Sequence, residues 1–177
     1  IFRDRIPPGA ATYERRGVGL GGKRDGMNIR VRRYRESDLA EVAELFYETV
    51  HSVNAADYTE EQLSAWTGER GVFAGRGADL LRGKTFVAEC CGKTAGFVSM
   101  REDGLLDLLF VHKDLQRRGI ASALCDEAER GYAEVRTYAS VTARPFFEGR
   151  GYSVVRKNEV IRRGVALENY LMIRSLR

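Results

Sequence analysis

The sequence predicts an α+β fold in which a mainly antiparallel sheet is covered by helices. Three strand-like runs, 85–91, 94–100 and 105–111, are separated by breaks short enough for hairpins. In two other segments, 39–53 and 120–132, apolar residues recur every three to four positions, which is typical of helices with one buried face. A chain of 177 residues with this pattern fits one domain and can bury a sizeable core.

The start of the chain differs from the rest. Residues 1–26 show no apolar period and contain six glycines and two of the three prolines. We expect this segment to be a disordered leader. Met27 then opens the run MNIRVRRY, so we expect it to be the natural start and residues 27–177 to form the folded domain.

The first half of the domain alternates between strand and helix signals. Residues 29–34 alternate apolar residues with arginines, as a half-buried strand does. Ser37 is the expected cap of the first helix. Thr59 begins the capping-box sequence TEEQ of a second, short helix. Residues 67–84 are rich in glycine and charge, so we expect a loop there, with a helical turn near 79–81.

The second half begins with the apolar strand LLDLLFV and a turn that leads into a helix after Arg118. Pro145 stands in the first turn of a short predicted helix, where proline is tolerated. The remaining predicted elements are a strand over 135–141, that short helix over 143–149, and two closing strands over 152–160 and 165–173.

Composition excludes several classes of protein. Six basic and three acidic residues fall in 1–26, so the rest of the chain carries only +1 of the total net charge of +4, which argues against a nucleic-acid partner. No apolar run approaches the roughly 18 residues that a membrane span needs. The three cysteines have no metal-ligand spacing, and we expect reduced thiols in a cytoplasmic protein without a metal.

The sequence QRRGIA, residues 116–121, stands where a strand gives way to a helix. A helix start offers unpaired N–H groups and partial positive charge, which suit a phosphate. Gly119 lets a ligand approach the backbone closely. Taken alone, the stretch is equally a plain turn with solvated arginines. It lacks the lysine and hydroxyl of a nucleotide-binding P-loop and the glycine spacing of a dinucleotide site.

Its context adds a resemblance. QRRGIA after Leu109-Phe110-Val111 resembles the signature of the GNAT superfamily of N-acetyltransferases, and residues 140–152, SVTARPFFEGRGY, resemble its second motif. The resemblance covers residues 29–174. The stretch 49–58, TVHSVNAADY, is similar to a group of small bacterial acetyltransferases whose acceptors are mostly unassigned.

This resemblance implies a GNAT fold, with a mixed, mostly antiparallel sheet of six to seven strands and about four helices. Its fourth and fifth strands, 105–111 and 135–141, would splay apart to admit acetyl-CoA. The backbone amides of 117–122 would hold the pyrophosphate, and strand 105–111 would bind the pantetheine arm. The implied cofactor-binding residues are Phe110, Val111, Gln116, Arg117, Arg118, Gly119, Ile120, Ala121, Ser122, Ser140, Arg144 and Phe147.

The implied activity is direct transfer of an acetyl group from acetyl-CoA to a primary amine in a ternary complex. The acceptor is unidentified, and the protein would be a monomer or a homodimer. Phe147 stands where the family usually has the tyrosine that protonates the leaving thiolate. Ser140, Tyr138 or water would then replace it, or the domain is instead a non-catalytic acyl-CoA-binding sensor.

Two residues are candidates for the base that takes the amine proton. Asp107 interrupts an apolar strand, so it lies either at an open cleft or at an edge facing solvent. His51, near the end of the first helix, has an ordinary pKa of about 6.5 that suits a base. By resemblance the first two helices wall the acceptor site, which places His51 and Tyr58 there. The candidate catalytic residues are therefore Asp107, His51 and Ser140.

Overall fold

The computed structural model describes residues 28–176, so the predicted leader, 1–26, lies outside the described residues. The centre of the fold is one seven-stranded sheet with the order β1-β2-β3-β4-β5-β7-β6. All neighbouring strands are antiparallel except β4 and β5, which are parallel. The strands are β1 (Ile29–Arg33), β2 (Lys84–Cys90), β3 (Lys93–Met100), β4 (Leu105–Val111), β5 (Glu134–Ser140), β6 (Ser153–Arg162) and β7 (Val165–Ser175).

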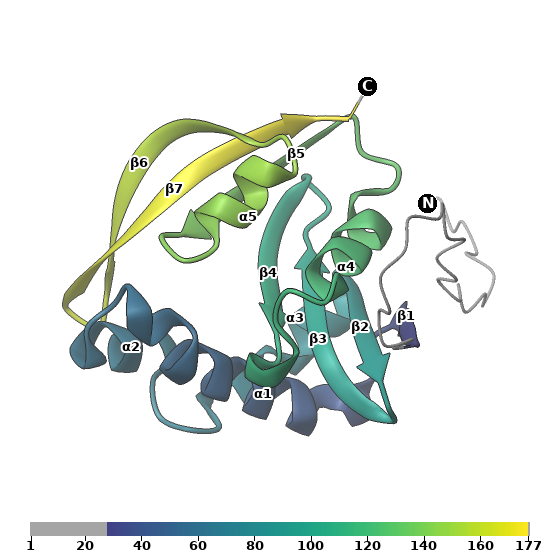
Figure 1. The fold of residues 1–177 in the computed structure, drawn as a ribbon. Coiled ribbons are helices and arrows are strands. Elements are labelled where there is room, and N and C mark those ends of the chain that lie inside the picture. The colour runs from purple at the N-terminus through teal and green to yellow at the C-terminus, as the bar shows by residue number, and fades with distance from the viewer. Residues whose placement is uncertain (1–27, 177) are drawn as a thin grey trace, which may run out of the picture.

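Helices cover both faces of this sheet. The α-helices are α1 (Leu39–Ser52), α2 (Glu60–Thr67), α3 (Gly77–Arg82), α4 (Ile120–Glu129) and α5 (Arg144–Gly149). Figure 1 shows α1 and α2 crossing the sheet on one side. α4 and α5 pack against the opposite face. Within residues 28–176 none of these helices combines the length and the apolar character that crossing a membrane requires. The predicted mixed sheet with about four helices is confirmed.

Two cores, one on each face, hold the layers together. On one face α4 buries Ile120 and Leu124 against the centre of the sheet, together with Phe147 of α5. On the other face Phe46 of α1 packs edge-on against Phe110 of β4, with ring centroids 4.9 Å apart. Burying such side chains is worth roughly 1.5–3 kcal/mol each, so both faces of the sheet are fixed by helix packing.

The sheet opens between β4 and β5. These strands pair only through Leu105 with Arg136 and Leu106 with Thr137, and the rest of each strand has no partner in the other. β5 instead pairs with β7 along its whole length, from Glu134 to Ser140. In Figure 1 the long β6–β7 pair arches away from β2, β3 and β4. The splay that the sequence resemblance implied is therefore present.

A buried ionic cluster ties β7 and the segment after α5 to α4. Glu129, whose side chain is 6% exposed, accepts hydrogen bonds from Arg150 and Arg174, each at 2.8 Å. It also accepts one from the hydroxyl of Tyr152 at 2.8 Å. Burial, reinforced by this bond to Glu129, raises the pKa of Tyr152. The segment after α5 and the last strand are thus held to α4 by one carboxylate.

Two local predictions were wrong. Ser37 does not cap the first helix; it lies in a 3₁₀ turn, Glu36–Asp38, and the helix begins at Leu39. Asp38 stands at the cap position, but its carboxylate binds Arg32 instead of the helix. The predicted loop 67–84 also contains more helix than expected, since a 3₁₀ helix, Val72–Arg76, runs directly into α3. The capping box at Thr59 is confirmed, with both reciprocal hydrogen bonds formed.

Candidate active site

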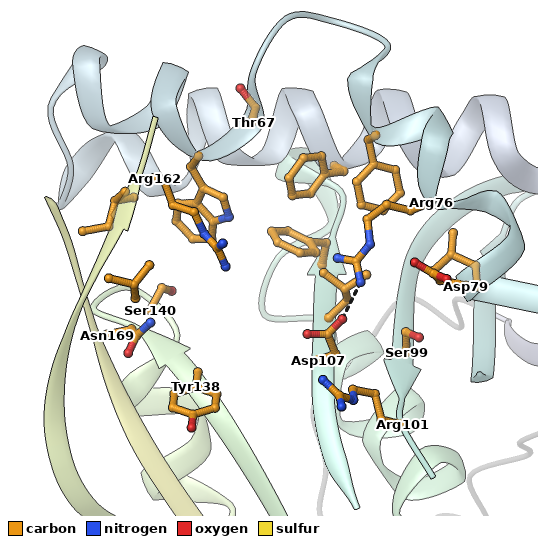
Figure 2. Close-up of a pocket in the computed structure, with 18 of the residues that line it drawn as sticks. Thr67, Arg76, Asp79, Ser99, Arg101, Asp107, Tyr138, Ser140, Arg162 and Asn169 are labelled. Atoms are coloured by element: carbon orange, nitrogen blue, oxygen red, sulfur yellow. Dashed lines mark hydrogen bonds and ion pairs between the residues drawn. The ribbon is translucent and has the colours of Figure 1, made fainter. Parts of the chain in front are cut away.

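A cavity of about 1320 Å³ lies beside the opening between β4 and β5. One wall comes from α1, α2 and the 72–82 helical segment, a second from β3 and β4, and a third from β5, β7 and β6. Figure 2 shows side chains from all three walls converging on the same space. Aromatic rings, among them those of Phe46, Trp66 and Phe110, give it an apolar floor.

Asp107 reaches this cavity because β4 contains a bulge. Leu106 pairs with Met100 and Leu108 with Ser99, so Asp107 has no partner on β3. Bulges bend a strand and re-aim its side chains, often beside active sites. Leu106 packs in the core under α4, whereas Leu108, two residues on, packs under α1. This change of face aims Asp107 into the cavity, where Figure 2 shows it.

Arg76 holds Asp107 in place. Its Nη2 donates to Oδ2 of Asp107 at 2.6 Å, and the two side chains remain 41% and 30% exposed. An ion pair this exposed adds little to stability. It leaves the other carboxylate oxygen of Asp107 open to the cavity for a ligand. Of the two interpretations of Asp107, the structure supports the open cleft, since β4 is an interior strand.

The wall formed by β5, β7 and β6 has a regular polar pattern. The lining residues alternate along β5 and β6, as the period of two requires: Tyr138 and Ser140 on β5, and Asn158, Val160 and Arg162 on β6. On β7, Leu167, Glu168 and Asn169 all line the cavity. The strand register places Ser140 opposite Asn169 and Asn169 opposite Asn158. Three polar side chains therefore form one row across three strands.

The open edge of β4 presents free backbone groups. The N–H of His112 donates to the carbonyl of Ala95 at 2.8 Å. Bonded residues alternate along an antiparallel strand, so Leu109 and Val111 turn their N–H and C=O groups away from β3. They face the side from which β5 has diverged. An extended ligand with amide groups can bond such an edge as another strand would.

Side chains occupy one of these groups already. The carbonyl of Val111 accepts a hydrogen bond from the amide of Gln116 at 2.6 Å and another from the hydroxyl of Thr49 at 3.3 Å. Gln116 thereby fixes the end of β4 to the turn before α4. The side chain of Gln116 therefore positions the end of β4.

The turn before α4 has an unusual backbone. Arg117 has φ of 59° and Gly119 has φ of 84°, both in the left-handed region. Gly119 is the N-cap of α4, and a Cβ added there would meet no atom within 4 Å. Glycine at position 119 therefore permits the left-handed backbone conformation and leaves the helix start open to a ligand. No side chain caps the helix. Ile120 is buried in the core, so it offers a ligand only its backbone.

His51 and Tyr58, the two residues expected at the acceptor site, differ in position. Tyr58 lines the cavity, whereas His51 is not among the lining residues. His51 Nε2 lies 3.0 Å from Oγ1 of Thr67, so it reaches the cavity only through that residue. Tyr58 donates to the carbonyl of Glu168 at 2.7 Å and accepts from the N–H of Val141 at 2.9 Å. Burial raises the pKa of Tyr58, although the Val141 N–H opposes it.

The second motif places its residues around the end of β5. Ser140 lines the cavity and accepts a hydrogen bond from the N–H of Ala143 at 3.1 Å. Arg144 binds Glu148 at 2.7 Å and lies 4.6 Å from the ring centre of Tyr170. Phe147 is buried in the core and does not line the cavity.

The cysteines lie outside the cavity. Cys125 is fully buried within α4, and burial raises its pKa to about 12. Cys90 is buried as well, and Cys91 is exposed in the β2–β3 turn. None of the three lines the cavity, so none offers a nucleophile there. In residues 28–176 no group of three His, Cys, Asp or Glu side chains is placed to hold a metal ion.

The sequence alone did not indicate Arg76, Arg162, Asn158 or Asn169 as site residues. Arg76 lies in the segment expected to be a loop. The other three become neighbours of the site only through the register of β5, β7 and β6. The alternation of side chains along β6 groups Asn158 and Arg162 on one face of the strand, but it does not reveal which face meets a cavity.

Comparison with known proteins identifies the class. The family described as "Acetyltransferase (GNAT) domain" matches residues 54–173. YafP of Escherichia coli K12, named as an N-acetyltransferase, is 32% identical over 146 residues, covering 82% of this chain and 95% of YafP. The fold is thus that of the GNAT acetyltransferases, which are acyltransferase enzymes. The chain belongs to the GNAT acetyltransferase family.

Solved structures agree with this assignment. A GCN5-related N-acetyltransferase of Rhodopseudomonas palustris is 32% identical, with a TM-score of 0.77 over 82% of this chain and 94% of that one. PaiA N-acetyltransferase of Thermoplasma acidophilum, solved with coenzyme A, has a TM-score of 0.68 at 20% identity, covering 84% of this chain and 99% of that one. yncA of Salmonella typhimurium, solved with acetyl-CoA, has a TM-score of 0.61 at 19% identity over 84% and 94%.

Proposed function

We propose that this protein transfers the acetyl group of acetyl-CoA directly to a primary amine within a ternary complex. The observation that carries the proposal is the opening between β4 and β5, which lies beside the cavity that Asp107 lines. PaiA and yncA, which share the fold, were solved with coenzyme A and acetyl-CoA.

In this proposal the turn before α4 binds the pyrophosphate. The backbone amides of 117–122 supply the unpaired donors and the partial positive charge of a helix start. The pantetheine arm lies in the opening between β4 and β5, where Leu109 and Val111 face away from β3. Ser140 and Phe110 stand on the two sides of that opening. Arg144 and Phe147 are assigned to the cofactor by the family motif alone.

The reaction then needs the amine as a free base. Asp107, with one oxygen open to the cavity, accepts a proton from the acceptor's ammonium group, either directly or through a water molecule. The amine nitrogen attacks the thioester carbon, and a C–N bond forms. The N–H of Val111 stabilises the negative charge on the oxygen. The C–S bond breaks, CoA leaves as a thiolate, and the nitrogen loses its second proton to that sulfur or to solvent, which leaves the neutral amide.

The leaving thiolate has an ordinary thiol pKa of about 8.5, so it departs without strong acid assistance. Phe147 has no proton to give. Tyr138 is 47% exposed on β5 and lines the cavity, which makes it the phenol best placed to supply a proton. Ser140 and solvent are the remaining sources.

The alternative function, an acyl-CoA sensor, is favoured only by Phe147. Both functions predict cofactor binding, and they differ in turnover. The test is CoA thiol release by the full-length protein with a panel of primary amines, followed by initial rates at varied concentrations of both substrates. Direct transfer predicts release and intersecting reciprocal plots. Parallel plots would show an acyl-enzyme route. Binding without release for every amine would establish the sensor.

A further inference from the structure

The arginines that line the cavity are almost all tied to other groups. Arg76 pairs with Asp107, Arg82 with Asp79 and Arg101 with Asp103. Arg163 donates to the carbonyl of Ala65 at 2.6 Å. Among residues 28–176, no hydrogen bond or ion pair engages Arg162, the last residue of β6, and Figure 2 shows its guanidinium projecting into the cavity.

A guanidinium presents a planar fork of donors that matches a carboxylate in two parallel bonds. Arg162 thus provides an anion-binding group inside the cavity that no residue of the described chain neutralises. Asp107 pairs with Arg76 through one carboxylate oxygen, and its other oxygen is the acceptor on the β4 wall, where the amine is expected. The two walls are complementary to a molecule that carries an amine at one end and an anionic group at the other.

The two walls belong to strands that lie on opposite sides of the opening in the sheet. In the strand order β4-β5-β7-β6, Arg162 stands three inter-strand spacings from β4. Hydrogen-bonded strands lie about 4.7–4.9 Å apart, and β4 and β5 are further apart where they diverge. An α-amino acid has only one carbon between nitrogen and carboxylate, the shortest reach among such molecules. An extended peptide adds about 3.3–3.6 Å per residue, so a peptide of a few residues reaches further from one wall to the other.

The surface between the two charges suits a peptide backbone. Ser140, Asn169 and Asn158 form the polar row across β5, β7 and β6, and all three line the cavity. The side-chain amide of Asn158 donates to that of Asn169 at 3.3 Å, which leaves further donor and acceptor groups of both for a ligand. Amide N–H and C=O groups of a bound peptide match them.

We propose, building on the function above, that the acceptor is a short peptide or peptide-like amine with a free carboxylate. Its amino group lies at Asp107, its amides lie along the Ser140–Asn169–Asn158 row, and its carboxylate binds Arg162.

The test uses the full-length protein, acetyl-CoA, and the acceptors glycine, diglycine, triglycine, tetraglycine and triglycinamide in a thiol-release assay. We expect kcat/KM to rise from glycine to triglycine, and to exceed that of triglycinamide by about tenfold. Arg162→Gln should reduce this preference to within about twofold. The control Arg156→Gln changes an exposed arginine on the same strand that does not line the cavity, and it should keep the preference.

Equal use of triglycine and triglycinamide by the unaltered protein would overturn the proposal, as would a preference that survives Arg162→Gln. Failure to acetylate any peptide of the series, while acetyl-CoA binds and other amines are acetylated, would overturn it and leave the acetyltransferase function standing. Failure to bind acetyl-CoA would overturn both the peptide-acceptor proposal and the acetyltransferase function.

Discussion

Replacing Asp107 by asparagine should lower kcat about 10²- to 10³-fold while acetyl-CoA still binds. The amide cannot take the proton that the acceptor amine must lose, and general base catalysis contributes about 10²–10⁴ in rate. Asparagine keeps the shape of the side chain in the bulge of β4. The change is measured by steady-state thiol release, with acetyl-CoA affinity measured separately by calorimetry. Asp107→Glu should recover part of the rate.

Two matched variants, at Arg76 and His51, test whether Asp107 itself is the general base. Arg76→Gln removes the ion pair but leaves the carboxylate, so its effect should be much smaller than that of Asp107→Asn. His51→Gln changes a residue outside the cavity lining and should alter kcat less than about threefold. A large loss in His51→Gln together with near-normal activity in Asp107→Asn would show that the base is the histidine.

Replacing Glu129 by alanine should lower the free energy of unfolding by about 3–5 kcal/mol. Breaking a buried ion pair leaves its partner charged and unpaired, which costs about that much. Arg150 is 12% exposed and would keep only one acidic partner, Asp126, whose side chain is 44% exposed, and the hydroxyl of Tyr152 would lose its acceptor. Burial alone would lower the pKa of Arg150, but the hydrogen bonds to Glu129 and Asp126 and the nearby negative charge together outweigh burial, so the net pKa is raised.

Urea unfolding measures this loss, with Glu127→Ala as the control. Glu127 lies on the same helix and pairs with Arg130, whose side chain is 64% exposed, so its removal should cost less than about 1 kcal/mol. Equal losses in the two variants would mean that the cluster around Glu129 does not hold β7 and the segment after α5 to α4.

Much of the fold follows from local patterns in the sequence. The β2–β3–β4 meander is predictable because the breaks between its strands are too short for anything but hairpins, and β4 was predicted with the bounds that the structure has. Of the helical segment 72–82 only the turn near 79–81 was predicted, because Gly75 and Gly77 have low helix propensity and the helix is too short to show a period. Ser37 fits a cap by type, but Asp38 and Arg32 engage each other there.

The site was predictable where a motif encodes it and hidden where tertiary structure makes it. Gly119 and the turn around it were indicated by the helix-start pattern together with the family resemblance. Asp107 was noticed because a carboxylate in an apolar strand is costly, yet only the bulge explains its direction. Arg162 was missed because the predicted strand ended at residue 160, and its approach to the cavity depends on how three strands pair.

Calorimetric titration of acetyl-CoA into the full-length protein, Gly119→Glu and Gly131→Glu tests the central claim most directly. Gly119 and Gly131 flank opposite ends of α4, have φ of 84° and 88°, and would each accept a Cβ without a contact within 4 Å. The two variants therefore carry similar backbone strain. We predict binding by the unaltered protein and by Gly131→Glu, and its loss in Gly119→Glu, where a carboxylate repels the pyrophosphate. Binding that survives in Gly119→Glu, or is absent from the unaltered protein, would contradict the account.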